Sequence, residues 1–136
     1  MKTKLLGVLF AAAFSGSVLS DHKGEEHGHS HATKSPANAE LFIISPKDGD
    51  VVGEKFTVKF GLQGMEVVPA GVNKPNSGHH HLLIDKKELP KAGVPMGKDV
   101  MHFGKGQKET EITLSKGEHT LQLILGDMAH IPHDPM

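Results

Sequence analysis

The sequence predicts an all-β sandwich formed by one domain, residues 40–136. The clearest evidence is the period of two in residues 56–62, where four large apolar side chains alternate with smaller or polar ones. Successive side chains of a strand point to opposite faces, so this segment should have one core face and one wet face. Five or six such short segments follow one another with turn residues between them. After residue 20 no helical pattern reaches about ten residues, so we expect two packed antiparallel sheets.

The first two strands are expected at residues 41–44 and 56–62. Ser45-Pro46 and the turn 47–50 end the first of them, because proline and Asp-Gly pairs favour turns. In the second strand, the residues expected to face the core are Phe56, Val58, Phe60 and Leu62, and those expected on the wet face are Thr57, Lys59 and Gly61.

The next strand, expected at residues 78–85, carries three consecutive histidines. Alternation places His79 and His81 on one face and His80 with Leu82 on the other, and we expect the second face to be the buried one. Imidazoles at i and i+2 on one face have Cα atoms about 7 Å apart. Both can therefore reach one metal ion, which makes His79 and His81 the first candidate ligands.

The later part of the domain is expected to contain a hairpin. Residues 89–99 hold too many prolines and glycines for a regular element, and residues 100–103 form at most a brief extended piece. Residues 109–114 and 119–125 read as two strands joined by a turn. Prolines exclude a central strand in residues 127–136. The apolar residues expected to face each other in the hairpin are Ile112 and Leu114 on one strand and Leu121, Leu123 and Leu125 on the other.

The N-terminal region is predicted to be a secretory signal followed by a flexible tail. Residues 1–20 contain Lys2 and Lys4, the apolar run 5–14 and then small residues, so we expect cleavage after residue 20 and a periplasmic or secreted protein. Residues 21–39 have almost no apolar content and are expected to be a histidine-rich tail and linker. The tail is either a loose chelator of divalent transition metals or a solvated linker, and its alternating histidines are His27, His29 and His31.

The composition excludes several classes of partner. No stretch approaches the about 20 apolar residues of a membrane-spanning helix. The chain has no cysteine, which excludes disulfides and a lipid-anchored cysteine. Without residues 1–20 its formal net charge is −3, and every basic residue is lysine, so nucleic acid is not an expected partner. The unusual feature is the 11 histidines, which point to metal binding or pH sensing.

Four motifs occur in order between residues 41 and 135. They are Asn76-x-Gly78-His79-His80-His81-Leu82-Leu83-Ile84-Asp85, His102-Phe103-Gly104-x-Gly106-Gln107-x-Glu109-Thr110-Glu111, Gly117-x-His119-Thr120-Leu121-Gln122-Leu123 with Gly126-Asp127, and His130-x-Pro132-His133-Asp134-Pro135. In this order and spacing they resemble a secreted bacterial family, domain of unknown function 4399. The resemblance implies an exported immunoglobulin-like antiparallel β-sandwich, and it implies no particular activity.

The same resemblance predicts that the sandwich lacks its closing strand. Members of that family usually continue past the last motif into one more strand, whereas this sequence stops at Met136. An immunoglobulin-like sandwich of this kind leaves unpaired backbone groups along residues 119–125 or their neighbour. Residues 127–136 could cover only part of that edge. We therefore expect self-association, or acceptance of a strand from a partner.

The histidines of the domain predict a site for copper or zinc. The loops at one end of a sandwich can converge on the start of the histidine strand, so histidines far apart in the sequence can share an ion. Met101 and Met128 are either additional thioether donors, which would favour copper, or gap-filling core residues. The predicted ligands are His79, His81, His102, His130 and His133.

Three further residues near these histidines have structural interpretations. Asp85 and Asp127 either orient imidazoles or end strands, and we favour the strand-end role for both. His119 heads the leucine-rich strand and is expected to cap the core.

We therefore expect an exported protein that binds copper or zinc for handling or buffering. Affinity should decline below about pH 6, where protons compete with the ion. The alternative is a metal-free envelope module whose histidines form structural hydrogen bonds. Catalysis is not expected, because the sequence has no Gly-x-Ser-x-Gly, His-Glu-x-x-His or phosphate-binding glycine loop and no cysteine nucleophile. An enzyme with a histidine-bound metal would need an open position for water in a pocket.

Overall fold

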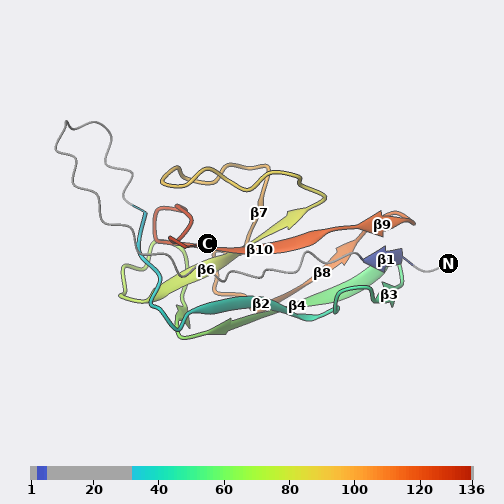
Figure 1. The fold of residues 1–136 in the computed structure, drawn as a ribbon, viewed down its shortest axis with the longest axis horizontal. Helices are drawn as coiled ribbons and strands as arrows, with labels where there is room; N and C mark the ends of the chain where they lie inside the picture. Colours follow the sequence, from blue (N-terminus) through green and yellow to red (C-terminus); the bar gives the residue numbers. More distant parts are fainter. Residues whose placement is uncertain (1–2, 6–31, 136) are drawn as a thin grey trace, which may run out of the picture.

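The computed structural model describes residues 3–5 and 32–135, and the regular structure in these ranges is β-strand (Figure 1). Within them no helix is long and apolar enough to cross a membrane. The strands are β1 (Thr3–Leu5), β2 (Glu40–Ser45), β3 (Val51–Val52), β4 (Lys55–Gln63), β5 (Glu66–Val67), β6 (Ser77–Ile84), β7 (Met101–His102), β8 (Glu109–Thr113), β9 (Glu118–His119) and β10 (Leu121–Gly126).

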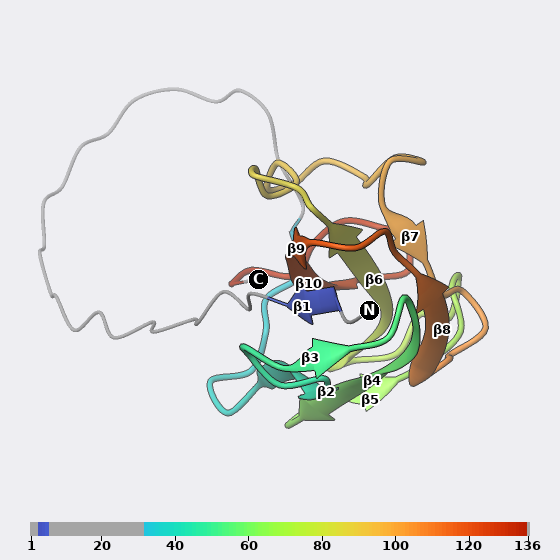
Figure 2. The same ribbon diagram turned by 90° about the vertical axis from the view of Figure 1, so that its right-hand side faces the viewer.

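Two packed sheets form the main body of the domain, as the views of Figures 1 and 2 show, and a small third sheet has the strand order β3-β1-β9. In one sheet β2 and β8 pair antiparallel on either side of β4. In the other β6 is central, with β10 antiparallel along one edge. β5 pairs parallel with the start of β6, and β7 pairs antiparallel with its middle. The arrangement confirms the predicted β-sandwich.

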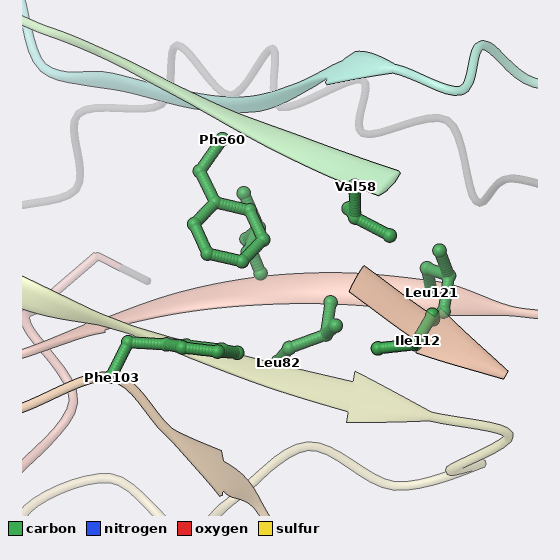
Figure 3. Packing of buried hydrophobic residues seen from close by; sticks show 7 residues of the cluster. Val58, Phe60, Leu82, Phe103, Ile112 and Leu121 are labelled. Atoms are coloured by element: carbon green, nitrogen blue, oxygen red, sulfur yellow. The ribbon is translucent and has the colours of Figure 1, made fainter. Parts of the chain in front are cut away.

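The main core lies between the two sheets and contains apolar residues from both. The predicted period of two in β4 is confirmed for residues 57–60, since Val58 and Phe60 are buried while Thr57 and Lys59 are exposed. Gly61, expected on the wet face, is buried instead, because the Phe42 ring of β2 lies over it. Burying one such side chain contributes roughly 1.5–3 kcal/mol, so this small set supplies much of the driving force for folding. Figure 3 shows how they interdigitate; the buried members of the cluster are Val58, Phe60, Leu82, Phe103, Ile112, Leu121 and Leu123.

The predicted hairpin of residues 109–114 and 119–125 is wrong. β8 pairs with β4, whereas β10 pairs with β6, so the chain crosses from one sheet to the other between them. Ile112 and Leu121 do belong to one cluster, but they meet across the core and not as neighbours within a sheet. The period of two indicates which side chains face the core, and two strands can satisfy it equally well from opposite sheets.

β6 is buried on both faces, although we expected burial on the face of His80 only. All of its residues from Ser77 to Leu83 are buried. The chain between β6 and β7 folds back over the face opposite the main core (Figures 1 and 2). There Leu83, Val100 and Ile124 form a second small core with Met96 packed against it. A central strand covered on both sides needs no polar face, which explains its continuous buried run.

Two further segments pair with strands at the edges of the sandwich, β1 and the C-terminal segment. β1, which lies in the predicted signal, pairs antiparallel with β3 and parallel with β9, and the other residues predicted as signal lie outside the described ranges. The end of β10 is covered by the C-terminal segment: Gly126 bridges to Pro132, and the His133 amide donates to the Leu125 carbonyl, 3.1 Å away. The predicted self-association stays a prediction.

Candidate metal centre

β6 and β7 bring three histidines to the same face of their sheet. His81 lies opposite His102 in the antiparallel register, and His79 is two residues before His81. The ring centroids are 4.7 Å apart for His79 and His81, 4.9 Å for His79 and His102, and 5.1 Å for His81 and His102. One ring nitrogen from each histidine lies within 4.8 Å of the other two, so a single ion could contact all three.

The turn after β10 adds a fourth ring, His130. Its centroid is 4.6 Å from that of His102 and 5.0 Å from that of His79. The Nε2 atoms of His130 and His102 are 3.0 Å apart. Nitrogen ligands about 2.0–2.1 Å from a tetrahedral ion are separated by roughly 3.3 Å, so this spacing fits a shared ion. Without an ion, one of these rings must donate its N–H to the other. His79, His81, His102 and His130 are called the four-histidine cluster below.

Asp127 holds the turn that carries His130. Its Oδ1 accepts hydrogen bonds from the amides of Ala129 (2.9 Å) and Ile131 (3.0 Å), and its Oδ2 accepts one from the Thr33 hydroxyl (2.9 Å). The turn places His130 at φ 63°, a conformation that non-glycine residues adopt uncommonly and only when neighbours hold them there. Asp127 is therefore a strand-end residue, as predicted, and through the backbone it also positions the His130 ring.

The two deepest rings of the cluster are neutral and have no hydrogen-bond partners among the described residues. His79 and His81 are 0% and 1% exposed, and neither ring nitrogen of either residue is paired. Burial, followed by the charges of His102 and His130, lowers the pKa of His79 to about 4. Burial and the charge of His79 lower the pKa of His81 to about 3. Proton competition should therefore be centred nearer pH 4 than the pH 6 expected from the sequence.

Two glycines make room for rings of the cluster. A Cβ on Gly126 of β10 would lie 2.6 Å from Cε1 of His81, and one on Gly104 would lie 2.4 Å from Cε1 of His102. Both distances are too short for real contacts, so a side chain at either position would displace an imidazole. Gly104 and Gly126, which belong to the sequence motifs, thus leave the space that the rings of His102 and His81 occupy.

His133 does not join the four-histidine cluster, contrary to the prediction. Its Nε2 is 3.0 Å from the Ser77 carbonyl oxygen and 3.1 Å from where a Cβ of Gly78 would stand. Gly78 shares its face of β6 with His80, so His133 lies on the face opposite to His79 and His81. The sequence places His130 and His133 in one loop, but only the fold determines the side of the sheet to which each points.

Two other histidines have environments of their own. His80 is buried in the main core, where its ring centroid is 5.0 Å from that of Phe60. His119 lies at the opposite end of β6, with Nδ1 2.7 Å from Asp85 Oδ2 and Nε2 2.7 Å from the Ser115 carbonyl oxygen. Asp85 also accepts a hydrogen bond from the Thr120 amide, so its predicted strand-end role is confirmed.

Met96, which sequence reasoning missed, brings a thioether side chain to Gly126, beside the His81 ring. Met101 and Met128, for which the sequence left open a donor role or a gap-filling role in the core, are 39% and 47% exposed, so the core role is wrong. Met96 packs against the second core, and its amide donates to the His130 carbonyl oxygen, 2.8 Å away. It lies in the proline- and glycine-rich segment 89–99, where no periodicity in the sequence indicates its direction.

The family described as "Domain of unknown function (DUF4399)" matches residues 58–136. The chain belongs to this family. The matched region contains all four residues of the four-histidine cluster, together with Gly104 and Gly126. No curated protein and no solved structure matches the chain. Membership in the DUF4399 family carries no activity with it, so the function must be argued from the geometry of the site.

Proposed function

We propose that this DUF4399 protein binds one transition metal ion, copper or zinc, through the four-histidine cluster, and that it handles or buffers the ion and does not turn over a substrate. The observation that supports the proposal is the convergence of three imidazole nitrogens within 4.8 Å of one another, with His130 beside them. Imidazole is the commonest metal ligand among side chains and suits both ions.

The electrostatic state of the rings supports the same function. A metal ligand must be the neutral imidazole, and the lowered pKa values of His79 and His81 keep both rings neutral at pH 7. A buried polar atom without a partner costs on the order of 1–3 kcal/mol. An ion would satisfy one nitrogen of each ring, whereas the metal-free protein bears the cost for both residues.

The accessibility of the cluster fits reversible loading. His79 and His81 form its buried side, while His102 is exposed and His130 is half-buried. An ion could therefore enter and leave on the side of His102 without unfolding of the sheet. We further propose that loading takes place outside the cytoplasm, because residues 1–20 have the composition of a secretory signal.

The test is elemental analysis of the protein purified without a His-tag, in forms with and without residues 21–31. We expect one tightly bound equivalent of metal in both forms, because the four-histidine cluster lies outside residues 21–31 and a preorganised site loses little entropy on binding. Exchanging His79 and His81 together for Gln should lower the affinity by orders of magnitude while the metal-free fold persists. His119→Gln is the matched control, since this histidine lies outside the cluster, beside Asp85.

Two outcomes would contradict the proposal. If the form without residues 21–31 no longer binds metal tightly, then the ion is bound by residues 21–31 and not by the cluster. Unfolding of the metal-free double variant, with unchanged affinity per folded molecule, would favour the alternative in which the histidines are structural.

A further inference from the structure

Met96 lies close to the four-histidine cluster, near His81 through its side chain and near His130 through its backbone. The point where a Cβ of Gly126 would stand is 3.0 Å from the methyl carbon of Met96, 2.6 Å from Cε1 of His81 and 3.0 Å from its Nδ1. The end of the Met96 side chain and the His81 ring therefore both border the space above the same glycine. The backbone of Met96 is also bound to the cluster, through the hydrogen bond of its amide to the His130 carbonyl oxygen.

Met96 is half-buried and also borders an open cavity. Its side chain is half-buried against Leu83, Val100 and Ile124. It also lines, with Leu83 and Val100, an open cavity of about 490 Å³. Met96 thus differs from Met101 and Met128, which are 39% and 47% exposed. It is a soft donor near imidazoles, on a loop that is hydrogen-bonded to the backbone of His130.

A thioether discriminates between the two ions that the imidazoles would accept. Zinc is bound by imidazole, thiolate and carboxylate, whereas thioether and thiolate are the soft ligands that select Cu(I). Magnesium and calcium prefer oxygen ligands, and the cluster itself offers only nitrogen.

We infer that the ion of this site is copper, and that Met96 supplies a thioether ligand to Cu(I) beside the imidazoles of the cluster. This inference rests on the proposed function, because it names the ion and adds a ligand to the same site. It requires that Met96 turn its sulfur toward an ion held by the cluster, from a position in which its methyl carbon and Cε1 of His81 lie 3.0 Å and 2.6 Å from one point above Gly126.

The experiment compares Met96→Leu with the wild-type protein and with the matched control Met128→Leu. Cu(I) affinity is measured anaerobically by competition with a chromophoric Cu(I) chelator, and Zn²⁺ affinity by competition with a zinc indicator. Met96→Leu should weaken Cu(I) binding by about tenfold or more, the size of effect seen for residues that support a metal site. It should leave Zn²⁺ affinity within about twofold, since leucine has a similar volume and keeps the packing against His81. Met128→Leu should change neither affinity.

X-ray absorption at the copper edge gives a second, independent measurement. The Cu(I)-loaded wild-type protein and Met128→Leu should show a sulfur neighbour of copper, and Met96→Leu should show nitrogen neighbours only. The wild-type measurement alone tests the inference even if Met96→Leu does not fold.

Each remaining outcome overturns the inference. Unchanged Cu(I) affinity in Met96→Leu, or no sulfur neighbour in the wild-type protein, shows that Met96 is not a ligand. Equal weakening of Cu(I) and Zn²⁺ shows that Met96 only packs against His81. If the wild-type protein binds either ion tightly and Met96→Leu changes neither affinity, this inference is refuted and the proposed function stands. If the wild-type protein binds neither ion, the proposed function itself is refuted.

Discussion

The two faces of β6 place neighbouring histidines in equally buried but chemically different surroundings. His80 on one face and His81 on the other are each 1% exposed, and neither has a hydrogen-bond partner for its ring nitrogens among the described residues. Burial is the first cause of the lowered pKa in both, to about 4 for His80 and about 3 for His81. By burial and protonation alone the two residues look alike.

The two rings differ in the residues that surround them. His80 packs against the ring of Phe60 in the main core, whereas the His81 ring has the rings of His79, His102 and His130 around it. A buried imidazole without partners is therefore not by itself a sign of a metal ligand. The sign is convergence of several nitrogens on one point, which here occurs on one face of the strand only.

The largest expected effect comes from exchanging each of these two histidines for leucine. His81→Leu should lower metal affinity by about 100-fold or more, since it removes a ligand. His80→Leu should leave the affinity unchanged. The free energy of unfolding of the metal-free His80→Leu variant should be unchanged or higher by up to about 1–2 kcal/mol, because an apolar side chain replaces unpaired polar atoms.

Calorimetric titration with Zn²⁺ and urea unfolding measure the two quantities. A loss of metal affinity in His80→Leu equal to that in His81→Leu would remove the distinction between the faces.

The second effect is on the pH dependence of stability. The pKa of His79, His80 and His81 in the folded protein is about 4, 4 and 3, below the usual 6.5, so the unfolded chain binds more protons between those values. Stability of the metal-free protein should therefore be full above pH 6.5 and fall as the pH drops toward 4. Each pKa unit corresponds to about 1.4 kcal/mol, so the loss by pH 4 should reach about 3 kcal/mol for each ring.

Urea unfolding across this pH range checks the sign. His80→Leu should show a shallower decline than the wild-type protein, because one of the three lowered pKa values is absent. A stability that stays level from pH 6.5 to 4 would contradict the assignment of these rings as neutral.

A smaller effect is expected from filling the space above Gly126. Gly126→Ala would place a Cβ 2.6 Å from the His81 ring, whereas Gly53→Ala meets nothing closer than 3.7 Å and is the matched control. The Gly126 variant should lose about 1–3 kcal/mol of stability through overpacking and about tenfold in metal affinity. The control should stay within about 0.5 kcal/mol of the wild-type value. Equal behaviour of the two variants would show that the cluster tolerates displacement of His81.

The smallest effect concerns the far end of β6, where His119 is paired with Asp85, whereas His79 and His81 have no hydrogen-bond partner among the described residues. The hydrogen bond to Asp85 raises the pKa of His119 above its usual value. Its contribution should be present below pH 6.5 and lost as the pH rises through the raised pKa, which is the opposite sign to the cluster. His119→Gln should cost under about 1 kcal/mol at pH 6 and still less at higher pH, with metal affinity unchanged. A pH dependence of the same sign as that of His80→Leu would contradict this contrast.

Much of the fold could be predicted because the period of two in β4 and the turn residues depend only on local geometry. The strands β2, β4 and β6 lie where the apolar runs predicted them, and the alternation of His79 and His81 with His80 follows from the pleat of a strand. The pairing of β8 with β4 was missed, because the sequence pattern fixes which side chains are apolar and does not identify the neighbouring strand.

The sequence by itself determined that this chain forms short strands, carries an excess of histidine and places His79 and His81 on one side of a strand. The tertiary structure alone decided that His102 lies opposite His81, that His130 faces the cluster while His133 faces away, and that Met96 reaches the same glycine as His81. The physical reason is that local sequence specifies the direction of a side chain relative to its own strand. Convergence of side chains from β6, β7 and two loops depends on register, crossover and the covering of β6 on its second face, which only packing of the whole domain determines.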